Sequence, residues 1–272
     1  MLNTITTYIV DAFTDEPFKG NPAGVCILNE TLSEKQMQSI AKELGHSETA
    51  FVTQMKNEST HAIRYFSPVL EIPLCGHATL ASSKVLFEIN PKKDEIHFKT
   101  IQNLDLRIRK KANKIQMEFP VYETIPQKAP DRLLKALGID TIVNSVFNPE
   151  TKILLLEIDS CEILQKLSPN FEKLKQSHNA INGVLITTTS QRLNFDFESR
   201  YFWPWSGTNE DPVTGGTHTF LAKYWSTRLN KKKMNSFQCS ERTGFMEVEL
   251  ISDTKLLIKS EAQIVLKGAL RL

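Results

Sequence analysis

The sequence predicts an α+β protein of two pseudo-symmetric halves, each a barrel-like mixed sheet bent around one central helix. The first observation is a repeat. Phe66-Ser-Pro68 followed by Glu71-Ile-Pro73-Leu-Cys-Gly76 returns as Phe202-Trp-Pro204 followed by Glu210-Asp-Pro212-Val-Thr-Gly215. The second is that each copy opens into a helical pattern of small and apolar residues, which is typical of a buried helix. The third is the strand-like alternation that surrounds both helices.

In the first half, a helix is expected between two early strands. Thr31-Leu-Ser-Glu34 has the spacing of a capping box, and apolar residues then recur at helical spacing until Gly45 ends the helix. Glu48 follows at the junction between this helix and the next strand. Residues 16–24 form a loop rich in Pro and Gly. Alternation predicts strands at 6–13, 25–28, 49–52, 61–66, 95–100, 105–109 and 114–119.

The second half repeats this order after a linker at 121–130, which contains two prolines and mixed polarity. We therefore assign 1–120 plus 260–272 to the first half and 121–259 to the second, with the site in the cleft between them. Helices are expected at 131–137, at 161–167 and after Gly216. Strands are expected at 145–147, 152–158, 183–188, 195–201, 236–239, 246–250, 256–259 and 263–266.

Composition excludes several classes of protein. The chain has 272 residues, 40% of them hydrophobic, and a net charge of +2 from 33 basic and 31 acidic side chains, so no strong field favours nucleic acid or a membrane surface. No apolar run reaches the roughly 20 residues that span a bilayer. The four cysteines are widely spaced, which excludes the usual zinc motifs and a disulfide framework. We expect a soluble cytoplasmic protein with reduced thiols.

The two glycine turns are candidate binding elements. A helix N-terminus carries unpaired N–H groups and the positive end of the helix dipole, and glycine lets a ligand approach the backbone closely. Gly76 in the first copy, and Gly215 with Gly216 in the second, would together hold an anion, most simply a substrate carboxylate. One such turn alone would more often be structural; two matched turns favour a binding role.

Three side chains beside these turns are candidates for proton chemistry. His77 lies in the first turn of a buried helix, where the dipole predicts a neutral imidazole. Asp211 precedes Pro212, which biases its backbone toward an extended conformation. Glu48 leads into an apolar strand, so we expect a partly buried carboxyl with a raised pKa. Such a group suits removal of a proton from carbon and its return.

Cys75 and Thr214 hold equivalent positions in the two copies. A duplicated racemase or epimerase with two bases needs an acid–base group from each half, typically a thiol. Threonine is a poor base, so inversion by two thiols is disfavoured and Cys75 is interpreted as a small packing residue. Glu71 and Glu210, at matching positions, are interpreted as structural.

Four motifs in order identify a resemblance. Asp11-Ala-Phe-Thr with Gly20-Asn-Pro-Ala-Gly-Val25, Ser47-Glu-Thr-Ala-Phe-Val52, Pro73-Leu-Cys-Gly-His-Ala-Thr79 and Glu210-Asp-Pro-Val-Thr-Gly215 resemble the PhzF-like phenazine-biosynthesis family over nearly the whole chain. That family is similar in fold to diaminopimelate epimerase and is usually homodimeric. The resemblance implies isomerisation of a dihydro-hydroxyanthranilate without a metal or organic cofactor.

The resemblance also implies roles for individual residues. Glu48 would move a proton between carbons, while His77 and Asp211 would hold the substrate and assist. The family commonly has Ser-Ala where this chain has Gly216-Thr217, so either a substrate-contacting hydroxyl is missing or Thr217 supplies it. The expected partner is a small anionic carboxylate, and no metal is expected. Two alternatives remain: an amino-acid or hydroxy-acid racemase that uses Cys75, and a non-catalytic ligand-binding or protein-binding member of the family.

Overall fold

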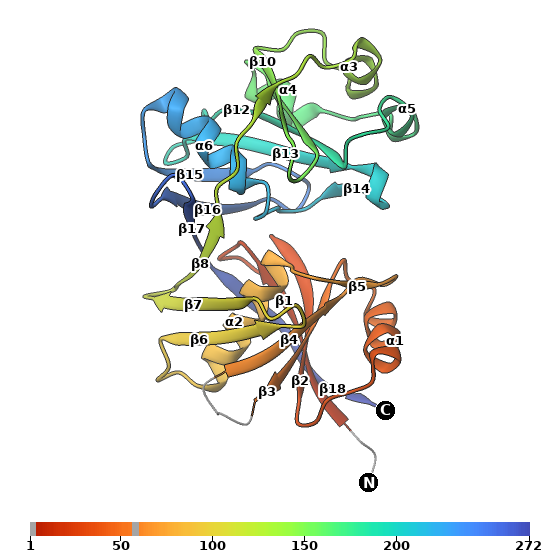
Figure 1. The fold of residues 1–272 in the computed structure, drawn as a ribbon, viewed down its shortest axis with the longest axis vertical. Coiled ribbons are helices and arrows are strands. Elements are labelled where there is room, and N and C mark those ends of the chain that lie inside the picture. The colour runs from red at the N-terminus through yellow and green to blue at the C-terminus, as the bar shows by residue number, and fades with distance from the viewer. Residues whose placement is uncertain (1–3, 56–59) are drawn as a thin grey trace. The chain divides into compact units, whose positions relative to one another are not determined.

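The computed structural model describes residues 4–55 and 60–272 (Figure 1). The chain divides into two compact units: unit 1 comprises Met1–Glu118 and Ile258–Leu272, and unit 2 comprises Phe119–Leu257. The sequence-based boundaries, after residue 120 and before residue 260, each lie two residues later in the chain than the boundaries of these units. Within the described ranges, no helix is both long and apolar enough to cross a membrane.

Unit 1 is a set of strands around one helix. The chain leaves the unit within β8 and returns within β17. Its elements are β1 (Thr4–Ala12), β2 (Asn21–Leu28), α1 (Glu34–Leu44), β3 (Thr49–Gln54), β4 (Thr60–Phe66), β5 (Glu71–Ile72), α2 (Gly76–Ile89), β6 (Glu95–Thr100), β7 (Asp105–Lys111), β8 (Lys114–Pro120), β17 (Lys255–Ser260) and β18 (Ala262–Arg271).

The helix α2 is buried, as its apolar and small residues predict. It contacts β1, β2, β3 and β18. Ten of its residues are buried, including His77 in the first turn and Phe87 near the end. A helix enclosed in this way has no polar face to present, which explains why its sequence carries almost no charge. The prediction of a buried helix after Gly76 is therefore confirmed.

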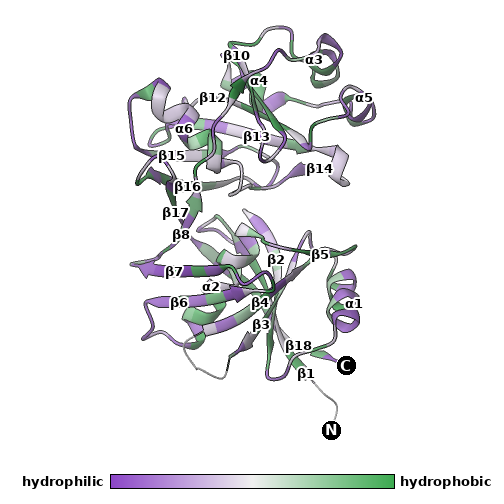
Figure 2. Ribbon diagram, viewed as in Figure 1, coloured by the Kyte–Doolittle hydropathy of each residue, from purple (hydrophilic) through white to green (hydrophobic). Residues whose placement is uncertain are grey.

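The helix α1 lies on the outside of unit 1 and is amphipathic. Purple and green segments are both visible along it in Figure 2. The prediction that Thr31 and Glu34 form its capping box is wrong. Ser33 is the N-cap: its hydroxyl accepts from the Gln36 N–H at 3.3 Å, and the Gln36 side chain accepts from the Ser33 N–H at 3.0 Å.

Unit 2 has its own elements. Its strand β9 pairs with β10, so part of the expected linker at 121–130 is a short strand. The helix α5 has no counterpart among the predicted elements. The elements are β9 (Ile125–Pro126), α3 (Asp131–Leu137), β10 (Asn144–Asn148), β11 (Ile153–Glu157), α4 (Cys161–Lys166), α5 (Phe171–Gln176), β12 (Gly183–Thr189), β13 (Phe197–Trp203), the 3₁₀ turn η1 (Pro204–Ser206), β14 (Thr208–Asp211), α6 (His218–Leu229), β15 (Lys233–Gln238) and β16 (Gly244–Leu250).

The two units use the same pattern of strand pairs. In unit 1, β1–β2 is antiparallel, β2–β3 parallel, β3–β4 antiparallel, β4–β6 parallel and β6–β7 antiparallel. In unit 2, β10–β11, β11–β12, β12–β13, β13–β15 and β15–β16 repeat these directions in order. The hairpins β4–β5 and β13–β14 both precede the buried helix of their unit. The sequence repeat therefore corresponds to a repeated fold, as predicted.

Candidate active site

Glu48 is held by the backbone at the start of β3. The parallel register places Gly24 of β2 opposite Thr49, and the Gly24 N–H donates to the Glu48 carbonyl at 3.2 Å. A Cβ on Gly24 would lie 2.8 Å from Thr49 Oγ1 and 3.1 Å from Leu44 Cδ1. Glycine suits this position because the side chains of Thr49 and Leu44 leave too little room for a Cβ unless one of them moves.

His77 is positioned by the start of α2. The helix begins at Gly76, with Cys75 as the N-cap in an extended conformation. Its first backbone hydrogen bond runs from the Thr79 N–H to the Cys75 carbonyl at 3.0 Å. The first turn contains no acidic residue, and the His77 side chain is buried.

The structure brings Glu48, His77 and Cys75 together. His77 Nε2 lies 3.2 Å from Glu48 Oε2, and the two side chains are 10% and 12% exposed, respectively. Cys75 Sγ lies 3.4 Å from Nδ1 and 3.9 Å from Nε2 of the same ring. The Ser47 hydroxyl lies 3.5 Å from His77 Nε2. The buried imidazole thus contacts a carboxylate, a thiol and a hydroxyl.

The protonation states expected for this pair from the sequence are wrong. Burial raises the pKa of Glu48, but hydrogen bonds from His77 and Ser47 and the charge of His77 outweigh burial, and the net pKa is lowered. Burial lowers the pKa of His77, but Cys75 and Glu48 outweigh burial and hold it well above its ordinary value. The carboxylate is therefore ionised and the imidazole protonated at neutral pH.

Magnitudes explain why the helix dipole does not keep His77 neutral. A helix terminus contributes about 0.3–1 kcal/mol, and at most about 2 kcal/mol, to the energy of a nearby charge. Two unit charges about 4 Å apart interact by about 4 kcal/mol at an effective dielectric constant of about 20. The contact with Glu48 therefore outweighs the dipole. That partner lies in a different element, so the local sequence around His77 does not reveal it.

Cys75 is a protonated thiol in this environment. Burial raises its pKa, and although the charge of His77 acts in the opposite direction, the net shift is upward. A buried thiol with a raised pKa is a poor nucleophile at neutral pH. Its contact with His77 nevertheless makes it part of the site, which the interpretation of Cys75 as a packing residue did not include.

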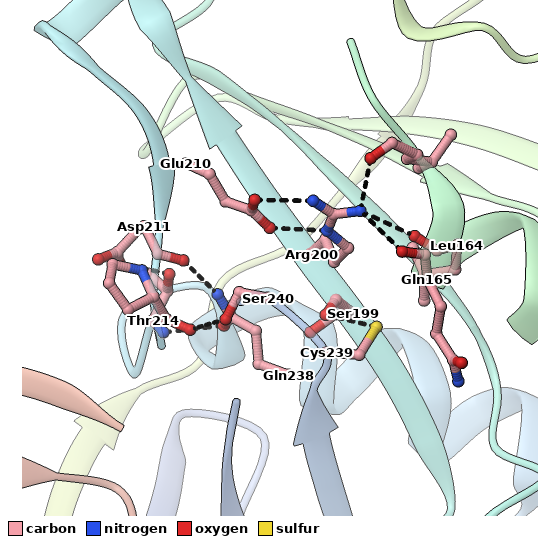
Figure 3. Close-up of polar contacts among 12 residues, drawn as sticks. Leu164, Gln165, Ser199, Arg200, Glu210, Asp211, Thr214, Gln238, Cys239 and Ser240 are labelled. Atoms are coloured by element: carbon pink, nitrogen blue, oxygen red, sulfur yellow. Dashed lines mark hydrogen bonds and ion pairs between the residues drawn. The ribbon is translucent and has the colours of Figure 1, made fainter. Parts of the chain in front are cut away.

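Asp211 belongs to a hydrogen-bonded turn in unit 2 (Figure 3). The Thr214 hydroxyl donates to Asp211 Oδ2 at 2.5 Å. The Gln238 side chain donates to the Asp211 carbonyl at 2.7 Å and accepts from the Thr214 N–H at 2.9 Å, and the Ser240 hydroxyl donates to the Pro212 carbonyl. Side chains from the strand β15 and the residues after it thus fix the path of the turn.

The second glycine turn leads into α6, which begins at His218. Space is open around Gly216, since an added Cβ would meet no atom within 4 Å. Thr217 is buried, and its hydroxyl donates to the Thr214 carbonyl at 3.0 Å. Its predicted contact with substrate stays a prediction, as do those of Gly76, Gly215 and Gly216.

Sequence reasoning missed His218, which occupies the position of Thr79 in the repeat. Thr79 Oγ1 donates to the Cys75 carbonyl at 2.6 Å, and His218 Nδ1 lies 3.0 Å from the equivalent Thr214 carbonyl. His218 is fully buried, and its Nε2 lies 2.8 Å from the Ser236 hydroxyl. Burial lowers the pKa of His218 to about 4, so this imidazole is neutral and structural.

Both copies are also held by an arginine that sequence reasoning did not select. Arg64 donates to the two carboxylate oxygens of Glu71 at 2.7 and 2.6 Å. Arg200 binds Glu210 in the same way, at 2.7 Å to each oxygen (Figure 3). Arg200 also donates to the Leu167 carbonyl at 2.8 Å. The structural interpretation of the two glutamates is confirmed. The available signal was an Arg-Tyr-Phe-x-Pro sequence present in both copies.

The predicted residues therefore form two groups. Glu48, Gly76 and His77 lie in unit 1, where the first and last are in contact. Asp211, Gly215, Gly216 and Thr217 lie in unit 2, on the turn before α6.

The sequence profile of the phenazine biosynthesis-like protein family matches residues 10–268. The chain belongs to this family. Phenazine biosynthesis-like domain-containing protein 1 of Mus musculus is 41% identical over 283 residues, covering 97% of this chain and 98% of the mouse protein. A protein of Pseudomonas aeruginosa named as an uncharacterized isomerase is 38% identical over 274 residues, covering 98% of this chain and 99% of that protein.

Solved structures extend the family relationship to the fold. A PhzF-family protein of Enterococcus faecalis superposes with a TM-score of 0.92 at 35% identity, covering 99% of this chain and 100% of the other. A hydroxyproline epimerase of Agrobacterium vitis, solved with bound trans-4-hydroxy-L-proline, has a TM-score of 0.61 at 9% identity, covering 100% of this chain and 94% of that one. The predicted fold class, two similar halves related to epimerases, is confirmed.

Proposed function

We propose that this protein is an isomerase of a small carboxylate-bearing metabolite, in which Glu48 moves a proton from one carbon to another. The observation that carries the proposal is the pair formed by Glu48 and His77, an ionised carboxylate beside a protonated imidazole in a largely buried setting. Relatives named as isomerases, and a fold shared with epimerases, support the same class of reaction.

The proton balance of the reaction is simple. The Glu48 carboxylate takes a proton from a substrate carbon, and the electron pair of that C–H bond is delocalised into the substrate. Protonated Glu48 then returns its proton to a second carbon, so no atom is lost and nothing is oxidised. His77 as an imidazolium stabilises the negative charge that develops on the substrate and keeps Glu48 ionised before the reaction.

The charge on His77 has a cost as well as a benefit. A carboxylate whose pKa is lowered is a weaker base, so Glu48 suits a carbon acid whose anion is already stabilised by conjugation. An unsaturated ring or conjugated double bonds that accept the electron pair provide that stabilisation. Asp211 and the turn 215–217 remain predicted contacts for this substrate; Asp211→Asn, with Asp159→Asn as an exposed control, tests whether unit 2 contributes to its KM.

The test is formation of the isomerised product, followed by NMR in water and in heavy water, for a panel of small carboxylates with an acidic C–H bond; deuterium in the product shows whether the proton held by Glu48 exchanges with solvent. The panel includes the dihydro-hydroxyanthranilate that the family resemblance implies and trans-4-hydroxy-L-proline, the ligand of the fold neighbour. Glu48→Gln removes the base while keeping the side-chain shape, so turnover should fall by about 10²–10⁴-fold. Glu43→Gln, on the exposed side of α1, should leave turnover unchanged.

Full activity of Glu48→Gln would contradict the proposal. A racemase acting through Cys75 is the second candidate, favoured by the 3.4 Å contact between Cys75 Sγ and His77 Nδ1. It requires that Cys75→Ser loses activity while Glu48→Gln retains it. A wild-type protein that binds members of the panel but neither isomerises them nor exchanges their protons supports the non-catalytic alternative.

The homodimer and the cytoplasmic location expected from the sequence stay predictions. Light scattering coupled to size-exclusion chromatography measures the first, and fractionation of the native cell measures the second.

A further inference from the structure

The residues Glu48, Cys75 and His77 present three different kinds of metal ligand at one place. A carboxylate oxygen, Sγ and a ring nitrogen all lie within 4.8 Å of one another. Cys75 and His77 are buried, and Glu48 is partly buried. In the searched residues, 4–55 and 60–272, this is the one cluster of three or more potential ligands with such spacing.

The distances approach those of a tetrahedral ion. Zinc bonds of about 2.0–2.2 Å to nitrogen and oxygen and about 2.3 Å to sulfur separate the ligand atoms by about 3.4 Å (N to O) and about 3.6 Å (S to N). In the structure, His77 Nε2 lies 3.2 Å from Glu48 Oε2 and 3.9 Å from Cys75 Sγ. Two edges of the tetrahedron therefore need shifts of only a few tenths of an ångström.

The ligand types select the metal. Calcium and magnesium prefer sites made of oxygen, so a thiol and an imidazole disfavour them. Mixed oxygen, nitrogen and sulfur ligands suit zinc and its close analogue cobalt(II). Three protein ligands would leave the fourth position of a tetrahedral ion open. Unit 2 has no equivalent set of ligands, because Thr214 and Gly216 stand where unit 1 has Cys75 and His77.

We propose that Glu48, Cys75 and His77 form a site for Zn²⁺ and that its occupancy blocks proton transfer by Glu48. Binding needs a thiolate and a neutral imidazole, so the metal displaces one proton from Cys75 and one from His77. The Glu48 oxygens then bind the ion instead of a substrate proton. Metal binding itself does not depend on the proposed function, whereas the inhibition rests on it.

The binding test uses untagged, reduced protein and Co²⁺ as a coloured substitute for zinc. Wild-type protein should show a cobalt–thiolate charge-transfer band in the near ultraviolet, and Zn²⁺ should displace it. Cys75→Ser should lose the band, while Cys26→Ser, a buried cysteine in the same unit, should keep it. Glu48→Gln and His77→Gln should each weaken Zn²⁺ affinity by more than about 10-fold. Even changes to residues that only support a metal ligand weaken affinity by about that much, and these two residues would bind the ion directly.

Circular dichroism of each variant verifies that the fold is kept, and a rise of the wild-type Tm with Zn²⁺ gives a second measure of binding. Wild-type protein without the band, or a band that survives in Cys75→Ser, would overturn the site. The inhibition is measured as the rate of product formation with and without Zn²⁺, followed by chelation. Turnover that persists at saturating Zn²⁺ overturns the block while leaving the proposed isomerase intact, whereas active Glu48→Gln overturns the isomerase while leaving metal binding intact.

Discussion

His77 Nε2 lies 3.2 Å from Glu48 Oε2, and this contact joins the segment between α1 and β3 to the first turn of α2. Each residue fixes the charge of the other, because the carboxylate favours the imidazolium and the imidazolium favours the carboxylate. Two groups that interact this strongly release their protons as a pair. Their function and their contribution to stability therefore depend on the same contact.

The first prediction concerns the pH dependence of activity. Glu48 must be ionised to act as a base, and its lowered pKa keeps it so until the pH falls below the ordinary carboxyl value of about 4.3. His77 must be protonated, and its raised pKa keeps it so well above about 6.5. The profile of kcat/KM against pH should be a broad bell, measured as the rate of product formation by NMR.

The same shifts determine stability. The contribution of Glu48 is present above about 4.3 and is lost as pH falls through its lowered pKa; that of His77 is present below about 6.5 and is lost as pH rises through its raised pKa. Urea unfolding of His77→Gln should therefore lack the decline that His77 adds above about pH 6.5, whereas buried thiols with a raised pKa, such as Cys26, lower the stability of both proteins above about pH 8.5. His218, with a pKa lowered to about 4, opposes folding only below about 6.5 and leaves that alkaline difference unchanged. An identical decline in both proteins would contradict the pairing.

The second prediction is that Gly24→Ala displaces Glu48. The new methyl group would lie 2.8 Å from Thr49 Oγ1, so Thr49, which follows Glu48 directly and is fully buried, must move. Crowding of this kind costs about 1–3 kcal/mol of unfolding free energy, and a displacement of about 1 Å at a catalytic group costs about 10²-fold in rate. Gly268→Ala is the control, since its Cβ would meet the nearest atom at 3.7 Å. Equal activity of the two variants would show that β3 tolerates the shift.

The third prediction compares the two arginines. Arg200→Met leaves the Glu210 carboxylate without its partner and the Leu167 carbonyl without a donor, so it should cost about 3–5 kcal/mol of unfolding free energy. Arg64→Met should cost less because the Arg64 side chain is 21% exposed, against 11% for Arg200. Urea denaturation at neutral pH measures both.

A double variant sharpens the comparison. Arg200→Met combined with Glu210→Gln removes the stranded charge and should recover part of the lost stability. If the double variant is as unstable as Arg200→Met alone, the bonds to the carbonyls, rather than the ion pair, carry the effect.

The sequence predicts the repeated part of this protein well. The doubled turn, the buried helix after Gly76 and the place of Glu48 at the entry to β3 follow from local patterns of apolar residues, glycine and proline. These features are local, so a window of about a dozen residues contains the information they need. The strand β9 was missed because two residues are too few to show a pattern, whereas α5 was missed although it is as long as α4, which was predicted.

Features that depend on distant partners could not be predicted. The protonation of His77 depends on Glu48, which is remote in sequence, and the need for glycine at Gly24 depends on the register of β2 against β3. The sequence showed an arginine at the same position of each copy, Arg64 in the first and Arg200 in the second. It did not show that each arginine would bind a glutamate from the next strand. Pairing across strands is therefore what the sequence alone leaves undetermined.

The arginine–glutamate pair has a consequence for how the two copies diverge. Each pair joins the two strands of the hairpin that precedes the turn, β4 to β5 in one copy and β13 to β14 in the other. Neither pair uses a side chain of the three turn residues that lead into the buried helix. Those three residues, Cys75-Gly-His77 in one copy and Thr214-Gly-Gly216 in the other, can therefore change while their support stays constant. The support of each turn is thus separate from its chemistry, so the same fold can present a thiol and an imidazole in one unit and a hydroxyl in the other.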